Sequence, residues 1–301
     1  MEAAFAAGPA VHEYALALAL AGEEGFQGER ALAGLRATFI SLQRAPAEGE
    51  TAALAANVQS KVKTMIGVYA TQFGPYPFVD EKYGHAEFVF GGGMEHQTCS
   101  SMGSFSEFVV AHELGHQWWG DMITCRDFHH IWLNEGFATY TEAIWAESQG
   151  GLAAYKADLA QNKFFGPGSV WVPDDTDEAR IFSSDLSYDK GSWVLHMLRS
   201  HFGDDLFRRA VKTYLERHSL STVTTDDLRQ VFEEVSGQPL DRFFDQWLYH
   251  GGAPELKVTY EWLAKERLAR VTVAQTQPVV APPVMSRRWT PRLRRMRCSG
   301  V

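Results

Sequence analysis

Two histidines and two glutamates in a fixed spacing constrain this chain more than any other feature. His112 and His116 frame the sequence HELGH, and Glu135 follows them. On a helix, residues four apart project from one face, so both imidazoles can reach one metal ion. Glu113 is placed to act as general base on a water molecule. Glu135 lies far enough along the chain for a second helix to return and supply a third ligand. Three protein ligands leave one coordination position open, which is typical of a catalytic zinc site.

The alternative interpretation is a chance motif on a core or surface helix. H-E-x-x-H is short enough to occur in unrelated chains. The Asn-Glu-Gly sequence around Glu135 and two further motifs, given below, favour a metallohydrolase instead.

Composition excludes some classes of partner. The chain has 301 residues, enough for one large domain or two smaller ones, and a formal charge of −9. That charge argues against a nucleic-acid partner, since the basic residues concentrate in the run 287–297. The three cysteines (Cys99, Cys125 and Cys298) have neither zinc-ribbon nor disulfide-framework spacing, so free thiols are expected.

The sequence shows no recognisable targeting signal. No apolar run reaches the ~20 residues of a membrane-spanning helix, so no transmembrane segment is expected. Residues 15–21 resemble a signal-peptide core, but acidic residues rather than basic ones precede them. If the chain is complete, a cytoplasmic location is expected. The sequence does not indicate the oligomeric state.

Helical periodicity dominates the middle of the chain. The alternation of Leu16, Leu18 and Leu20 fits a strand, but the alanines between them fit a helix equally well. The run Gly91-Gly92-Gly93 indicates close approach of the backbone to another group. Apolar spacing predicts helices over 57–72, 106–120, 134–148, 188–201, 225–235 and 240–249, and strands over 85–90, 256–260 and 268–273.

Four motifs in order resemble the catalytic domain of the aminopeptidase N family of zinc metallopeptidases. They are Gly92-Gly93-Met94-Glu95-His96, HELGHQWWGD from His112, WLNEGFATY from Trp132, and Tyr188-Asp189-Lys190-Gly191. The resemblance covers about residues 57–277. It implies an α+β fold of the thermolysin-like type, mostly helical with a small sheet-bearing lobe, and zinc between the lobes.

The resemblance also implies roles for single residues. His112, His116 and Glu135 would hold one Zn²⁺ per chain, and Glu113 would serve as the base. Tyr188 matches the family tyrosine whose hydroxyl donates to the tetrahedral oxyanion. Without the family, Tyr188 reads as an aromatic packed on the core at a helix start.

Glu95 corresponds to the glutamate that binds the free α-amine of a substrate. Gly92, Gly93 and Met94 precede it and are expected to line the same peptide-binding site. Taken alone, the glycines fit a flexible turn. The implied function is that of a zinc-dependent aminopeptidase (EC 3.4.11.-), which hydrolyses the N-terminal bond of peptides with a free N-terminus through an activated water.

Two substitutions depart from the family motif Gly-Ala-Met-Glu-Asn. Gly93 stands in the alanine place and His96 in the asparagine place. A neutral His96 would replace the hydrogen bonds of the amide, whereas a protonated one would compete with the substrate amine for Glu95. The sequence does not indicate which N-terminal residue is preferred.

The organisation expected from the resemblance is incomplete at both ends. It comprises an unassigned segment 1–56, the thermolysin-like domain 57–252, the start of a β-sandwich module 253–277, and a disordered tail 278–301. Family members carry a β domain before this lobe and a helical domain after it. A chain without these domains is expected to have a wide cleft filled with water and weak peptidase activity.

Two alternative functions remain from the sequence. An inactive or weakly active relative could act as a peptide-binding or scaffolding module. An endopeptidase could use the same zinc lobe, although Glu95 would then have no purpose.

Several conspicuous residues have simpler interpretations. Trp118 and Trp119 are expected in the core, and His129-His130 in a loop rather than at a second metal. Thr139, one turn after Glu135, could orient a ligand through its hydroxyl.

Overall fold

A computed structural model describes residues 13–19, 38–44, 50–87, 91–265 and 267–276. The chain divides into two compact units, Met1–Ala253 and Pro254–Val301. The tail 278–301 expected to be disordered, and most of the unassigned segment 1–56, lie outside the described residues.

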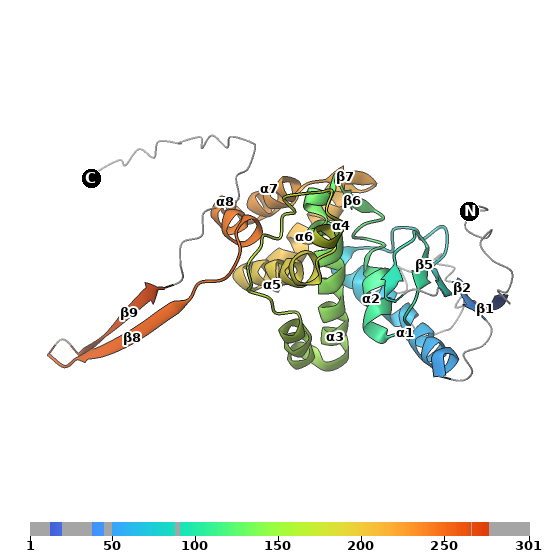
Figure 1. Ribbon diagram of the computed structural model, residues 1–301, viewed down its shortest axis with the longest axis horizontal. Coiled ribbons are helices and arrows are strands. Elements are labelled where there is room, and N and C mark those ends of the chain that lie inside the picture. The colour runs from blue at the N-terminus through green and yellow to red at the C-terminus, as the bar shows by residue number, and fades with distance from the viewer. Residues whose placement is uncertain (1–12, 20–37, 45–49, 88–90, 266, 277–301) are drawn as a thin grey trace. The chain divides into compact units, whose positions relative to one another are not determined.

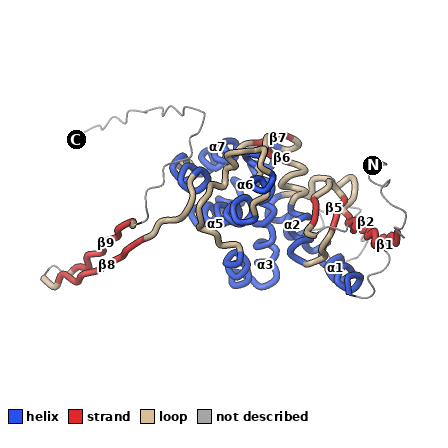
Figure 2. Tube along the Cα trace, in the orientation of Figure 1, coloured by secondary structure: helices blue, strands red, loops and turns tan. Residues whose placement is uncertain are grey.

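The first unit is an α+β structure dominated by helices, coloured along the chain in Figure 1 and by type in Figure 2. Its α-helices are α1 Glu50–Phe73, α2 Glu107–Gly115, α3 Trp132–Gln161, α4 Glu178–Ile181, α5 Gly191–Phe202, α6 Asp204–His218, α7 Thr225–Ser236 and α8 Asp241–Phe244. Shorter helical turns within the described residues are the 3-10 turn η2 Phe128–His130 and the π-helical turns η3 Ser184–Lys190 and η4 Asp245–Tyr249. None of the helices in the described ranges combines the length and apolar character needed to cross a membrane.

Small sheets complete the first unit. Strands β3 Gly84–Glu87, β5 Cys99–Met102 and β4 Gly93–Met94 form a three-stranded sheet in that order, with β3 parallel and β4 antiparallel to β5. β1 Glu13–Ala19 pairs with β2 Thr38–Arg44, and β6 Ile123–Cys125 pairs with β7 Ser221–Val223. The leucine alternation at residues 16 and 18 therefore belongs to a strand. In Figure 1 the three-stranded sheet lies beside α2, with α3 on the other side of that helix.

The core fixes α1, α2 and α3 against one another. The buried Tyr69 hydroxyl on α1 lies 3.1 Å from Ala111 O on α2 and 3.0 Å from Thr141 O on α3. Gly115 lets α2 and α3 approach closely, because a Cβ there would overlap the Thr141 hydroxyl. Trp118 and Trp119 are buried as expected, and Trp119 stacks on Phe137 at 3.9 Å. The helix with the histidines is thus held directly against the helix with Glu135.

Two glycines bring α3 against the start of α5. A Cβ added to Gly136 would lie 3.0 Å from Gly191 Cα, and one added to Gly191 would lie 3.0 Å from Gly136 Cα. Backbone therefore packs directly on backbone, one residue after Glu135 and directly after the turn that carries Tyr188.

Several boundaries differ from those expected from sequence. α2 ends at Gly115 rather than Gly120, because Trp118 N bonds to Gly115 O in a tighter turn and Gly120 has φ +146°. α3 runs on to Gln161 through a kink at Gly150 and Gly151. The expected strand over 85–90 is β3, and residues 88–90 lie outside the described ranges. Helix α6 was not predicted.

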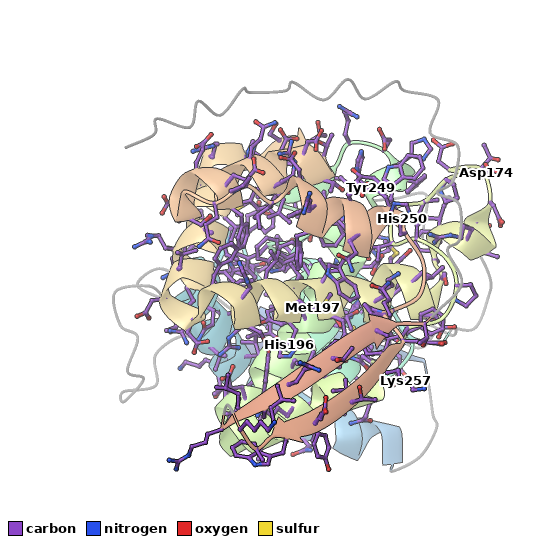
Figure 3. All side chains as sticks on the ribbon, turned by 90° about the vertical axis from the view of Figure 1, so that its left-hand side faces the viewer. Asp174, His196, Met197, Tyr249, His250 and Lys257 are labelled. Carbon is purple, nitrogen blue, oxygen red and sulfur yellow. The ribbon has the colours of Figure 1, made fainter. Side chains whose placement is uncertain are left out.

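The second unit contains a β-hairpin of β8 Leu256–Leu263 and β9 Leu268–Gln275. Both strands expected from the sequence are present. Tyr260 lies opposite Val271, and Val258 opposite Val273, so apolar side chains share one face. Lys257, labelled in Figure 3, and Thr259 lie on the other face. The β-sandwich interpretation of this segment stays a prediction.

Candidate metal and peptide site

Helices α2 and α3 bring two imidazoles and a carboxylate to one point. Ser106 caps α2, since its hydroxyl accepts from Val109 N at 3.3 Å. His112 Nε2 and His116 Nε2 lie 3.1 Å apart. Glu135 Oε2 lies 3.4 Å from the first and 3.2 Å from the second. The three predicted ligands therefore converge.

The outer nitrogens of both histidines have partners of their own. His112 Nδ1 lies 2.8 Å from Glu142 Oε1, and His116 Nδ1 lies 2.9 Å from Trp119 O. Each Nδ1–H can donate outward, which leaves each Nε2 lone pair directed at Glu135. Sequence reasoning missed Glu142. Its spacing from Glu135, two helical turns on α3, is the signal that could have found it.

Two overlapping clusters of ligand-type atoms occur in the described part of the chain. His112, His116 and Glu135 have one donor atom each within 4.8 Å of the others, and so do Glu95, Glu113 and His116. Two neutral imidazoles and a carboxylate are ligands that suit a divalent transition metal. Burial opposes the charge on Glu135, but the neighbouring imidazoles, His116 foremost, outweigh burial when they are protonated and lower the pKa of Glu135 to about 2.

Glu113 is buried beside this cluster. Its side chain is 5% exposed, and its Oε2 has no hydrogen-bond partner among the described residues. Burial raises the pKa of Glu113 to about 7, against the opposing effect of His112 and His116. A Cβ on Gly93 would lie 2.5 Å from Glu113 Oε1, so the glycine run marks a close approach of backbone to this carboxylate. The expectation drawn from the three glycines is confirmed at Gly93.

Tyr188 lies against the His112 ring. It belongs to the π-helical turn η3, and its ring stacks on the His112 imidazole at 5.8 Å and 16°. Burial, followed by the negative charge of Glu135, raises the pKa of Tyr188 far above its usual range, so its hydroxyl stays protonated. It is a donor placed beside the cluster rather than only a core aromatic.

The strand β4 forms the other side of the site. Glu95 Oε1, just after β4, lies 3.9 Å from His116 Nδ1. Met94 is 41% exposed, and the exposed His96 lies with its Nδ1 2.8 Å from Ser101 Oγ. His96 thus bonds within its own sheet. A cleft of about 1010 Å³ joins these residues, lined among others by Gly92, Gly93, Met94, Glu95, His112, Glu113, His116, Glu135, Glu142 and Tyr188.

Two weaker expectations have clear outcomes. Thr139 was expected to orient a metal-binding residue, but its buried hydroxyl has no hydrogen-bond partner in the described ranges. Glu142 contacts the predicted ligand His112 instead. His129 and His130 form the 3-10 turn η2 between α2 and α3. His129 Nδ1 lies 2.6 Å from Val172 O, and His130 Nδ1 lies 2.9 Å from Thr225 Oγ1. Both are structural residues rather than metal ligands.

Comparison with known proteins gives one family. A model described as the peptidase family M1 domain matches residues 94–247. Aminopeptidase M1-C of Oryza sativa is 34% identical over 174 residues, which cover 53% of this chain and 20% of that protein. The tricorn protease-interacting factor F2 of Thermoplasma volcanium is 31% identical over 175 residues, 53% of this chain and 22% of that protein.

Solved structures agree with this match. The M1 zinc metallopeptidase of Deinococcus radiodurans is 31% identical with a TM-score of 0.63, covering 74% of this chain and 50% of that one. A mutant of it was solved with a Tyr-Ser-Ala substrate. Aminopeptidase A of Legionella pneumophila shares the fold, with 20% identity and a TM-score of 0.69 over 80% of this chain and 29% of that one. The chain thus spans half or less of the length of these relatives.

Proposed function

The chain belongs to the peptidase M1 family, and on that premise we propose that it is a zinc-dependent aminopeptidase acting on peptides with a free N-terminus. The observation that carries the proposal is the convergence of His112, His116 and Glu135 beside the buried Glu113, whose Oε2 has no hydrogen-bond partner among the described residues. A thermolysin-like arrangement of the two lobes is part of the proposal, as is assignment of residues 57–252 to the catalytic domain and of 253–277 to the start of a β-sandwich module.

The donor set fits one Zn²⁺. Both imidazoles have an outer partner that fixes the ring, and the carboxylate lies within 3.4 Å of both inner nitrogens. When bound, Zn²⁺ supplies a Lewis acid that polarises the scissile carbonyl and lowers the pKa of a water to about 7.

The surrounding residues divide the remaining work. Glu113 takes a proton from the attacking water and passes it to the leaving amine. Tyr188, protonated and beside His112, donates to the developing oxyanion. Glu95 binds the positive α-amine, with Gly92, Gly93 and Met94 alongside the peptide backbone. This carboxylate stabilises the binding of a free N-terminus and does not stabilise the binding of an internal peptide segment.

The alternatives are less well supported. A peptide-binding scaffold has no use for a buried base and a converging ligand set. An endopeptidase has no use for a carboxylate 3.9 Å from His116 at the end of the cleft strand.

Metal analysis of ligand variants tests the zinc assignment. His112→Ala and Glu135→Ala should each lose the zinc that the parent chain binds, at about one per chain. His201→Ala, which removes an exposed histidine on α5, is the matched control and should keep it. Full zinc content in both ligand variants would disprove the assignment.

A further inference from the structure

Thr98 has an unusual backbone for its residue type. It lies in the turn between β4 and β5, three residues after Glu95, with φ +63° and 6% exposure. The left-handed region is unfavourable for a β-branched residue, since its Cβ crowds the neighbouring carbonyl. Such a conformation persists only where surrounding contacts enforce it.

Two hydrogen bonds hold Thr98 in place. Its N–H donates to Gln117 Oε1 at 2.9 Å, and its carbonyl accepts from Gly84 N at 3.0 Å. A backbone N–H can only donate, so the amide oxygen of Gln117 must face it. The Thr98 conformation therefore depends on a side chain that follows His116 directly in the chain.

Gln117 is fully buried, at 0% exposure. Its Oε1 also lies 3.2 Å from the Tyr76 hydroxyl, whereas its Nε2 has no partner within the described residues. A buried amide with an unpaired donor is unfavourable compared with an apolar side chain of the same size. Gln117 provides an acceptor for the Thr98 N–H, which an apolar side chain could not provide.

The turn held this way is the one that carries Glu95. His96 N bonds to Met94 O and Cys99 N to His96 O, both at 2.9 Å, so the turn is internally fixed from Met94 onward. Thr98 then ties its far end to the residue after His116. One side-chain hydrogen bond thus joins the turn after Glu95 to the residue after His116.

We propose that Gln117 is a positioning residue that, by holding Thr98, fixes the amine anchor Glu95 relative to the metal helix. This rests on the proposed aminopeptidase function. Gln117 does not touch the substrate. It determines how strongly a free N-terminus is preferred.

Gln117→Met removes the acceptor at nearly constant volume and tests the proposal. The ratio of kcat/KM for a free tripeptide to that for its N-acetylated form should fall about tenfold, through a rise in KM for the free peptide. Zinc content and cleavage of the acetylated peptide should stay at the parent level. Hydrogen exchange of the Thr98 amide should become faster.

Thr98→Gly provides the rescue. Glycine adopts positive φ without strain, so the turn needs no external bond to hold its shape. The double variant Gln117→Met, Thr98→Gly should recover most of the lost preference, which general damage to the core would not allow. Tyr76→Phe, which removes the other group near Gln117 Oε1, is the control and should keep the parent ratio.

The outcomes separate the two claims. A parent chain that cuts free and acetylated peptides equally overturns the proposed function. A parent chain that prefers free peptides, with Gln117→Met unchanged in that preference, overturns the positioning role alone. Loss of preference in Gln117→Met without recovery in the double variant also overturns it.

Discussion

The two walls of the cleft are built in different ways. The helical wall, from α2 and α3, carries ligand-type side chains that are almost fully buried: the side chains of His116 and Glu135 are 1% and 6% exposed. The strand wall, β4 with the turn after it, is more open, with Met94 41% exposed and the Glu95 side chain 18% exposed. The first wall is fixed by core packing, the second by a two-residue strand and a strained turn.

This difference indicates a division of labour. Groups proposed to perform the chemistry lie where close packing in the core fixes them. Groups proposed to recognise the substrate lie at the edge of a small sheet, where backbone remains accessible to a peptide. Substitutions in the helical wall should therefore impair the chemistry, whereas substitutions in the strand wall should impair substrate recognition.

The largest effect is expected on the helical wall from Glu113→Gln. The amide cannot accept the proton of water, so kcat should fall by about 10³-fold while zinc content is unchanged. Kinetics and metal analysis on the same preparations measure this, with the exposed Glu178→Gln as control. Turnover near the parent value would place the base elsewhere.

A second, smaller effect tests how packing positions Tyr188. Gly136→Ala puts a Cβ 3.0 Å from the Gly191 backbone at the start of α5 and 3.2 Å from Ser187 O in η3, so α3 must move away from both. A shift of this kind should lower kcat by up to about 10²-fold, as should Tyr188→Phe. If both act on the same donor, the double variant should be little worse than Tyr188→Phe alone. Fully additive losses would contradict this link.

On the strand wall, Glu95→Ala should weaken recognition and leave the chemistry intact. Free peptides should lose about tenfold or more in kcat/KM, because a charged hydrogen bond to the α-amine is lost, while acetylated peptides lose little. Equal losses for both substrates would mean that Glu95 belongs to the chemistry of the helical wall.

The smallest effect on catalysis is expected from Asp158, a residue that acts on the stability of α3. Burial, assisted by the charge of Glu142, raises the pKa of Asp158 to about 7, and its Oδ2 has no partner among the described residues. The unfolded chain releases this proton near pH 4, so the carboxyl stabilises the fold at low pH and loses that contribution as pH rises to 7. Asp158→Asn should therefore gain stability relative to the parent as the pH rises from 4 to 7, by up to about 4 kcal/mol for a rise of this size, measured by urea unfolding. A constant difference would contradict the raised pKa.

Sequence predicted the helical wall better than the strand wall. His112 and His116 follow from local helical spacing, and Glu135 from the Asn-Glu-Gly motif after them. Helix α7 follows from its cap, where Asp227 Oδ2 accepts from Thr224 N at 2.7 Å and Gly237 takes φ +72°. Such signals depend on residues close in the chain.

Partners brought together only by packing were not predictable in the same way. The hydrogen bond between Thr98 N and Gln117 Oε1 joins the turn between β4 and β5 to the residues after α2, and no pattern in either sequence segment predicts it. Strands β6 and β7 have three residues each, too few to show alternation. The π-helical turn η3 begins at Ser184, before the helix expected from Tyr188.

Cleavage of one peptide with free and with acetylated N-terminus tests the account most directly. The zinc-loaded chain should cut the free peptide at its first bond and the acetylated form at least about tenfold more slowly, since only the free amine pairs with Glu95. A chelator should abolish both reactions. Equal cleavage of the two peptides, or cleavage at internal bonds, would contradict an aminopeptidase built from these two walls.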